Sequence, residues 1–118
     1  MEWTADTIAE RVWLALDAAD LDEFAQLLDP DVTWGPPGGQ DTCRNKEQVL
    51  SWYQKGRAAG TRATVSAMEV HGDQLLVGLA VSGGSDPERW QILVVGPGGV
   101  TDIRGFEDRQ TAFARLRL

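Results

Sequence analysis

The fold is decided by residues 62–81, which read RATVSAMEVHGDQLLVGLAV. Apolar and polar side chains alternate along residues 62–71, as they do in a strand that buries one of its two faces. The pair Gly72-Asp73 is a hairpin signal, and residues 75–81 form the returning strand. The stretch therefore predicts two antiparallel strands joined by a tight turn.

A second hairpin is predicted in the residues that follow. Residues 89–95 and 100–106 read as strands, and the Gly-Pro-Gly-Gly run at 96–99 joins them. A wider connection at 82–87 separates this hairpin from the first. After the last strand, Glu107-Asp108 can cap a short tail helix. The side chains that would dock this helix are Ala112, Phe113 and Leu116.

The residues before 61 carry their apolar side chains at helical spacing instead. Residues 5–18 predict a first helix, with Thr7 and Glu10 at the spacing of a capping box. Asp20 can cap a second, shorter helix. The pair Asp29-Pro30 would end it, because the residue before a proline is pushed out of the helical region.

A short strand and a third helix complete the first half of the chain. Residues 32–34 predict the strand, and the Gly-Pro-Pro-Gly-Gly run at 35–39 predicts a loop after it. Asn45 can cap the third helix, which Gly60 can terminate. One face of that helix carries Val49, Trp52, Tyr53 and Gly56.

This order of elements predicts an α+β fold. Because the helices come first and hairpin-linked strands follow, we expect N-terminal helices packed on one face of a curved antiparallel sheet. Hairpin-linked strands twist and curl, so helices laid on the concave side would enclose a pocket. A chain of 118 residues has room for one core, and residues 1–118 are expected to form a single domain.

The composition narrows the functions to consider. The net charge of -7 disfavours binding to nucleic acids, which needs a positive surface. No apolar run approaches the roughly 20 residues of a membrane helix, and the first residues lack the features of a signal peptide. Cys43 is the only cysteine, which excludes an intrachain disulfide. We therefore expect a cytoplasmic protein without a cofactor or metal, which binds neither nucleic acid nor membrane.

Three stretches carry a resemblance to a known family. They are residues 20–34, where the second helix runs into the first strand, residues 42–53, where the third helix begins, and residues 104–109, where the last strand ends. With the element order, they resemble the nuclear transport factor 2-like superfamily, which includes SnoaL-like polyketide cyclases and ketosteroid isomerases. The resemblance implies a cone-shaped fold around a pocket. Its members are enzymes, ligand binders or interaction modules, so function must be argued from the site.

The catalytic residues of the enzymes in this superfamily match the chain only in part. Ketosteroid isomerases resemble it around the first strand, where Trp34-Gly35 stand in place of their catalytic aspartate. Scytalone-dehydratase-like members use a pair of histidines, whereas this chain has only His71. Limonene-epoxide-hydrolase-like members have an arginine and an aspartate two apart on a strand, plus a second aspartate. Asp102-Ile103-Arg104 offers the pair in reversed order, and the sequence places no second acid beside it.

The candidates for catalysis are Asp102, Arg104 and His71. Asp102 and Arg104 lie two apart in a predicted strand, so both side chains leave the same face. On a concave face, Asp102 would be a general base and Arg104 a charge stabiliser; on an exposed face they would form a surface ion pair. His71 is of a type that transfers protons, but its place beside the turn equally suits a solvated side chain.

The candidates for ligand contact are Trp13, Trp34, Trp52 and Tyr53, aromatic residues on the elements that would surround the pocket. Aromatic side chains at such spacing also build hydrophobic cores, so a packing role stays open for each. A pocket lined by several indoles favours a flat, apolar ligand. Cys43, just before the third helix, is predicted to be a packed loop cysteine.

Two functions fit these features of the chain. The first is a small-molecule-binding protein of the SnoaL-like type, with acid–base chemistry on a hydrophobic metabolite if it is an enzyme. The alternative is a non-catalytic dimerisation or protein-interaction module. Residues 90–95 are apolar on both faces of their strand, so something besides the three helices must cover one face. The two functions are compatible, and we expect a homodimer with a pocket in each subunit.

Overall fold

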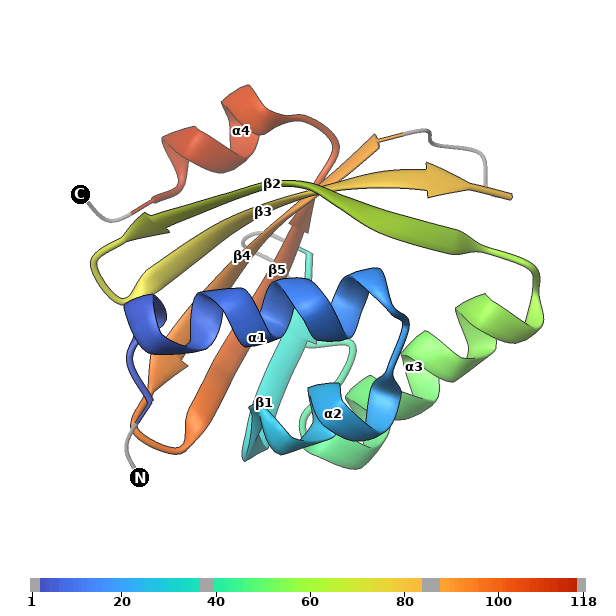
Figure 1. Ribbon diagram of the computed structural model, residues 1–118, viewed down its shortest axis with the longest axis horizontal. Helices are drawn as coiled ribbons and strands as arrows, with labels where there is room; N and C mark the ends of the chain where they lie inside the picture. The colour runs from blue at the N-terminus through green and yellow to red at the C-terminus, as the bar shows by residue number, and fades with distance from the viewer. Residues whose placement is uncertain (1–2, 37–39, 84–87, 117–118) are drawn as a thin grey trace.

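The computed structural model of the protein describes residues 3–36, 40–83 and 88–116. The predicted loop at 35–39 and the predicted connection at 82–87 lie in part outside these residues. Helices precede a run of strands, as predicted (Figure 1). The elements are α1 (Ala5–Asp17), α2 (Leu21–Gln26), β1 (Leu28–Gly35), α3 (Lys46–Ala58), β2 (Arg62–His71), β3 (Gln74–Ser82), β4 (Glu88–Gly96), β5 (Gly99–Phe106) and α4 (Arg109–Ala114).

The strands form one curved sheet in the order β1-β5-β4-β3-β2. From β2 to β5 each strand pairs antiparallel with the next, which confirms the predicted meander. β1 differs, because it pairs parallel to β5 and makes the sheet mixed. Parallel neighbours need a long connection rather than a hairpin, and here α3 and the three strands β2, β3 and β4 lie between them in the chain.

Short polar side chains begin all four helices. Asp20, Asn45 and Asp108 act as N-caps, as predicted, and each accepts a hydrogen bond from the backbone N–H three residues on. The predicted cap of α1 was wrong. Thr4 caps this helix, because its hydroxyl accepts from the Thr7 N–H at 3.2 Å while its own N–H donates to the Thr7 hydroxyl at 2.9 Å. None of the helices in the described ranges is long and apolar enough to span a membrane.

β1 is longer than the predicted strand at 32–34. It begins at Leu28 and contains Pro30, while α2 already ends at Gln26. A proline has no N–H to donate, so it is tolerated in a strand at an edge or at an irregularity. β1 lies at the edge of the sheet, and its pairing with β5 shifts register between Leu28 and Thr33. Pro30 therefore breaks no ladder bond.

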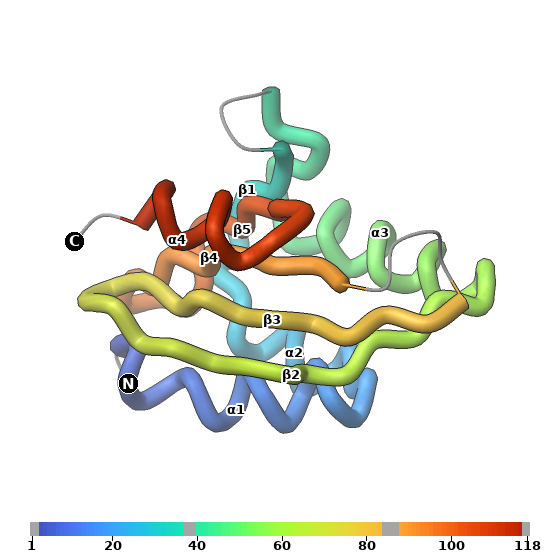
Figure 2. Tube along the Cα trace, turned by 90° about the horizontal axis from the view of Figure 1, so that it is seen from above, coloured from blue at the N-terminus to red at the C-terminus, as the bar shows by residue number. Residues whose placement is uncertain are grey.

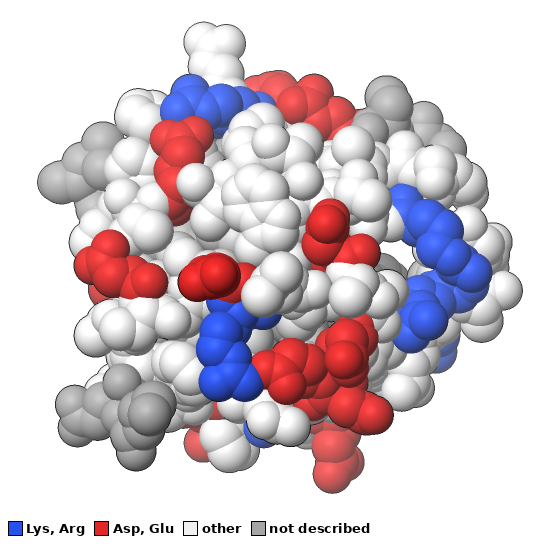
Figure 3. Space-filling view, in the orientation of Figure 1, with Lys and Arg blue, Asp and Glu red and all other residues white. Residues whose placement is uncertain are grey.

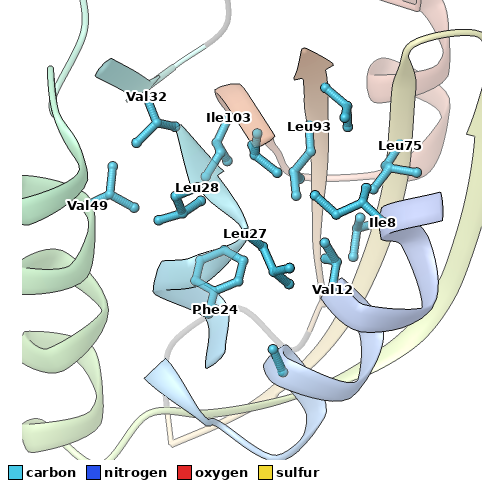
Figure 4. Packing of buried hydrophobic residues seen from close by; sticks show 14 of the residues in the cluster. Ile8, Val12, Phe24, Leu27, Leu28, Val32, Val49, Leu75, Leu93 and Ile103 are labelled. Atoms are coloured by element: carbon cyan, nitrogen blue, oxygen red, sulfur yellow. The ribbon is translucent and has the colours of Figure 1, made fainter. Parts of the chain in front are cut away.

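The sheet is covered on both faces. Its inner face packs against α1, α2 and α3 and holds the larger core, which includes Leu75, Leu93 and Ile103 (Figure 4). Its outer face packs against α4, and Figure 2 shows α1 and α4 on opposite sides of β3. The chain's own tail helix thus supplies part of the cover that the apolar strands require. The core of the outer face consists of Leu76, Trp90, Ile92, Phe106, Ala112 and Leu116.

Candidate functional site

An aromatic cluster lies on the inner face, between α3 and β1. The rings of Trp34 and Tyr53 stack with their centroids 5.0 Å apart, and Trp52 meets Trp34 edge-on at 6.0 Å. Phe24 meets Tyr53 edge-on at 5.3 Å from the other side. Trp52 is 50% exposed and Phe24 is fully buried, so the cluster runs from solvent into the core. The structure thus brings together three of the four aromatic residues predicted to contact a ligand.

The local sequence explains how these rings converge. The Asn45 cap sets the start of α3, so that Val49 and Tyr53, four residues apart, point into the core while Trp52 lies at its rim. Trp34 leaves the inner side of β1. Its backbone is also paired with Cys43, since the Trp34 N–H donates to the Cys43 carbonyl at 3.0 Å and the Cys43 N–H returns a bond of 2.9 Å.

The Tyr53 hydroxyl ends in the core beside the Gln91 side chain. Burial raises the pKa of Tyr53 to about 12. The Gln91 side chain lies close enough to the phenol to oppose this rise by a weak hydrogen-bonding interaction, and Cys43 adds to the rise. The phenol therefore stays neutral at physiological pH. Within the described part of the chain, neither the Tyr53 oxygen nor the Gln91 Oε1 atom makes a hydrogen bond of normal geometry, although both are buried. Buried polar atoms without partners are rare in folded proteins.

Two further polar side chains belong to this region of the inner face. Burial raises the pKa of the Cys43 thiol, with Lys55 opposing the rise, so this buried cysteine is a protonated, packed residue rather than a nucleophile. Arg89 lies two residues before Gln91 and shares its face. A Cβ atom at Gly105 would come within 3.2 Å of an Arg89 guanidinium nitrogen, so the missing side chain of Gly105 leaves room for this cation.

The sequence analysis did not predict Gln91 and Arg89 as site residues, although the sequence around Gln91 contains a signal for it. It is a polar residue inside the apolar run of residues 90–95. Strand alternation places it on the same face as Leu93 and Val95, both of which lie in the larger core. A buried polar side chain on a core face usually has a structural or functional partner. Arg89 stands at the start of the strand and carries no such signal.

Trp13, the fourth predicted aromatic, lies elsewhere. It is 36% exposed and lines an open groove of about 460 Å³ between α1 and the edge strand β2. Figure 3 views the molecule from the side of α1 and shows acidic and basic side chains spread over this face among uncharged surface. The groove is lined by Ala9, Glu10, Trp13, Leu14, Met68 and Val70.

Asp102 and Arg104 lie together as predicted, but on the outer face of the sheet. The Arg104 Nε and Nη2 atoms donate to the two oxygens of Asp102 at 3.0 and 2.9 Å. Nη2 also donates to Asp41 at 2.5 Å, and the Thr33 hydroxyl donates to Asp102 at 2.5 Å. The hydrogen bonds to Asp102, and then those to Asp41, raise the pKa of Arg104, which stays charged. Asp102 and Arg104 point outward because Ile103, the residue between them in the strand, is fully buried in the larger core on the inner face.

His71 also lies on the outer face, under α4. Its Nε2 atom is 3.1 Å from Glu69, and its ring meets Phe113 edge-on at 5.7 Å. Arg109 donates two hydrogen bonds to Glu69, at 2.9 and 2.8 Å. His71 is therefore a packed contact of α4 rather than a solvated turn residue. In the described ranges, no three His, Cys, Asp or Glu side chains are grouped as metal ligands would be.

Known proteins resemble the chain both in sequence and in fold. Residues 9–116 match the SnoaL-like domain family. No curated protein matches the chain significantly. Among solved structures, a candidate polyketide cyclase from Sinorhizobium meliloti has a TM-score of 0.68 at 22% identity and covers 85% of this chain and 94% of its own. A candidate ketosteroid isomerase from Kribbella flavida has a TM-score of 0.71 at 18% identity, with coverages of 95% and 87%.

A third structure, an LEH-like epoxide hydrolase from M. tuberculosis, has a TM-score of 0.65 at 18% identity, with coverages of 93% of this chain and 86% of its own. At such identities the likeness shows the fold alone. It confirms the cone-shaped architecture that the sequence predicts, with helices packed on a curved sheet.

Proposed function

The chain belongs to the SnoaL-like domain family, and on that basis we propose that it binds a small, largely apolar molecule on the inner face of its sheet. The body of the ligand lies against the indoles of Trp34 and Trp52. One oxygen of the ligand meets the Tyr53 hydroxyl and the Gln91 side chain. The ligand enters from solvent beside Trp52, whose side chain is half exposed.

A single observation carries this proposal. Among the residues that the structure describes, two buried polar atoms beside the aromatic cluster, Tyr53 Oη and Gln91 Oε1, have no hydrogen-bond partner of normal geometry. Leaving a buried donor or acceptor unpaired costs about 1–3 kcal/mol. An apolar side chain of the same shape would avoid this cost. The two groups are therefore suited to a partner that the free protein lacks.

The chemistry of the two groups sets the character of the ligand. The neutral Tyr53 phenol donates a hydrogen bond, and the Gln91 Oε1 atom accepts one. Neither atom is reachable by water, so a ligand displaces side chains at the rim of the cluster to reach them. A hydroxyl group on the ligand meets both requirements, because its oxygen accepts from Tyr53 and its O–H donates to Gln91 Oε1. The names of the similar structures, a polyketide cyclase and a ketosteroid isomerase, refer to oxygen-bearing carbon compounds, and this supports a largely apolar compound that carries a hydroxyl group.

The proposal is tested by measuring affinities for matched ring compounds with and without one hydroxyl group. Tyr53→Phe and Gln91→Met each keep the shape of the site and remove one polar contact. We expect each to weaken binding of the oxygenated compound about tenfold, which corresponds to the net value of one buried hydrogen bond. Binding of the compound without the oxygen should change little.

Trp13→Phe provides the matched control, because Trp13 is an aromatic residue of α1 that lies in the separate groove. It should leave both affinities unchanged. If Tyr53→Phe and Gln91→Met bind the oxygenated compounds as tightly as the unaltered protein does, the inner-face assignment is wrong.

Acid–base chemistry by Asp102 and Arg104 stays a prediction. It would take place away from the proposed ligand site. The two side chains lie on the outer face and are only partly exposed, at 25% and 23%. A molecule held by Tyr53 on the inner face is out of their reach. For any substrate that is turned over, Asp102→Asn tests this role. Loss of turnover there, with full activity in Tyr53→Phe, would place the chemistry on the outer face.

A further inference from the structure

Arg104 holds both described ends of the connection that follows β1. Its Nη1 atom donates to the Pro36 carbonyl at 3.2 Å, and its Nη2 atom donates to the Asp41 carboxylate at 2.5 Å. The same guanidinium is bound by both oxygens of Asp102 on β5. One side chain of the sheet thus fastens Pro36, where the connection leaves β1, and Asp41, where it returns.

The path of this side chain depends on Gly35. A Cβ atom at this position would lie 2.9 Å from Arg104 Nη1 and 2.8 Å from the Gln40 carbonyl oxygen. Such distances are shorter than real Cβ contacts, and one of the two neighbours is backbone that has little freedom to move. Glycine at position 35 therefore lets the guanidinium pass across β1 to the returning chain.

The fastened segment is also the wall of the inner-face site. Asp41 is followed by Thr42 and Cys43, whose N–H groups donate to the Trp34 carbonyl at 2.7 and 2.9 Å. Trp34 in turn stacks on Tyr53. The ion pairs on the outer face and the aromatic rings on the inner face are therefore joined through one short stretch of backbone, residues 40–43.

We propose that Arg104, with Asp41 and Asp102, is a positioning residue that holds Trp34 and Cys43 in place for the inner-face site. Its importance for ligand binding rests on the function proposed above, whereas the fastening itself does not. Arg104 lies on the outer face and does not touch a ligand bound at the inner-face site. It acts by keeping residues 40–43 against β1, so that the ring of Trp34 keeps its place over Tyr53.

The charges explain why the arginine is needed. Asp41 and Asp102 both accept from the same Nη2 atom, so their carboxylates face each other across it. Without the guanidinium, two like charges would remain close together and push the returning segment away from the sheet. A lysine keeps the charge but not the planar fork that binds several acceptors at once, so it should restore the arrangement only in part.

Cys43 offers a readout that needs no ligand. It is the only cysteine in the chain, and it is 3% exposed. A thiol reagent such as 5,5′-dithiobis(2-nitrobenzoate) therefore reacts only when residues 40–43 open. We expect Arg104→Met to speed this reaction about tenfold or more under native conditions, since local opening governs the reaction of a buried group. Arg104→Lys should lie between this variant and the unaltered protein.

Arg109→Met is the matched control, because it removes an arginine that also makes two hydrogen bonds to one carboxylate on the outer face. Arg109 fastens α4, and its contacts in the described part of the chain are with Glu69 and Phe113 rather than with residues 40–43. Its loss should therefore leave the Cys43 rate unchanged. Adding Asp41→Asn to Arg104→Met removes the repulsion and should slow the reaction again. Asp41→Asn alone serves as the test if Arg104→Met does not fold.

The proposal is overturned if Arg104→Met and Asp41→Asn react at the rate of the unaltered protein. It is also overturned if the rates of all variants follow only their global stability in urea, with Arg109→Met falling on the same line. Either outcome would leave the ligand-binding proposal standing, because no ligand takes part in this experiment.

Discussion

Tyr53 is the central residue of the proposed site, and the ionisation of its phenol can be measured directly. The chain has one tyrosine, so the ultraviolet absorbance of the phenolate reports this side chain alone. Because burial raises its pKa to about 12, we expect almost no ionisation in the folded protein near pH 10, where an exposed tyrosine is half ionised. A midpoint near pH 10 in the folded protein would show that the hydroxyl is not buried.

The same shift predicts how stability depends on alkaline pH. The unfolded chain releases the Tyr53 proton near pH 10, while the folded protein keeps it until about pH 12. The folded state therefore binds more protons over this range, and the free energy of unfolding should fall as the pH rises through it. Tyr53→Phe should lack this part of the loss in urea unfolding series at several pH values. Equal pH profiles for the two proteins would contradict it.

The sequence predicted which side-chain types form the site better than it predicted the directions in which they point. Trp34, Trp52 and Tyr53 converge because helix and strand spacing fix which way they point. The direction of Asp102 and Arg104 was not predictable, because the other face of their strand offers Thr101, Ile103 and Gly105, which is no clearer a core face. In the structure, burial of Ile103 alone settles it.

Among the elements, α4 is the one whose docking should respond to acid. Glu69 on β2 holds Arg109 of α4, whose hydrogen bonds lower the pKa of the Glu69 carboxyl below its ordinary value of 4.5, with a smaller contribution from His71. A lowered pKa means that the ion pair stabilises the folded protein above about pH 4.5 and is lost as the pH falls through the lowered value. The Asp108 cap of α4, whose pKa is lowered by the Thr111 N–H, acts in the same direction.

We therefore expect Glu69→Gln to loosen α4 at neutral pH, by about 0.5 kcal/mol because the pair is partly exposed, and to make its docking less sensitive to acid. Hydrogen exchange of the α4 amides measures this. Glu23→Gln is the control, because Glu23 pairs with Arg11 between α1 and α2. If the α4 amides exchange no faster in Glu69→Gln than in the unaltered protein, or if they also exchange faster in Glu23→Gln, this ion pair does not hold the helix.

The elements themselves were largely predictable, because caps, turns and apolar spacing are local signals. Asn45 and Asp108 begin helices where the sequence places them, and Gly60 ends α3 with a positive φ of 90°. The parallel pairing of β1 was not predictable, because no local pattern records which strand becomes its neighbour. The start of β1 was hidden by Pro30, a residue that usually argues against a strand.

In the molecule as a whole, α4 decides how much apolar sheet surface is left for a partner. It covers the core of the outer face, including Trp90, Ile92 and Phe106. We expect Ala112→Asp, which places a charge in this fully buried contact, to release α4 and increase self-association. Sedimentation velocity with binding of an apolar dye measures both effects. An unchanged sedimentation coefficient without dye binding would mean that α4 is not the cover.

The homodimer stays a prediction, and sedimentation velocity of the unaltered protein tests it. Since α4 occupies the apolar part of the outer face, a dimer formed through that face would use its rim, where Val94, Asp102 and Arg104 are partly exposed. We expect a concentration-dependent dimer at micromolar concentrations. A monomer over that range would contradict the prediction and leave the inner-face site as a property of the single chain.

Tyr53 Oη and Gln91 Oε1, unpaired among the described residues, are proposed to be kept in the core for a ligand to use, and urea unfolding of Tyr53→Phe without any ligand is the sharpest test of this. Removal of an unpaired hydroxyl relieves a desolvation cost, so we expect a variant as stable as the unaltered protein or more stable by about 1 kcal/mol. A loss of about 1 kcal/mol or more would mean that the hydroxyl already has its partner in Gln91, and would contradict the claim.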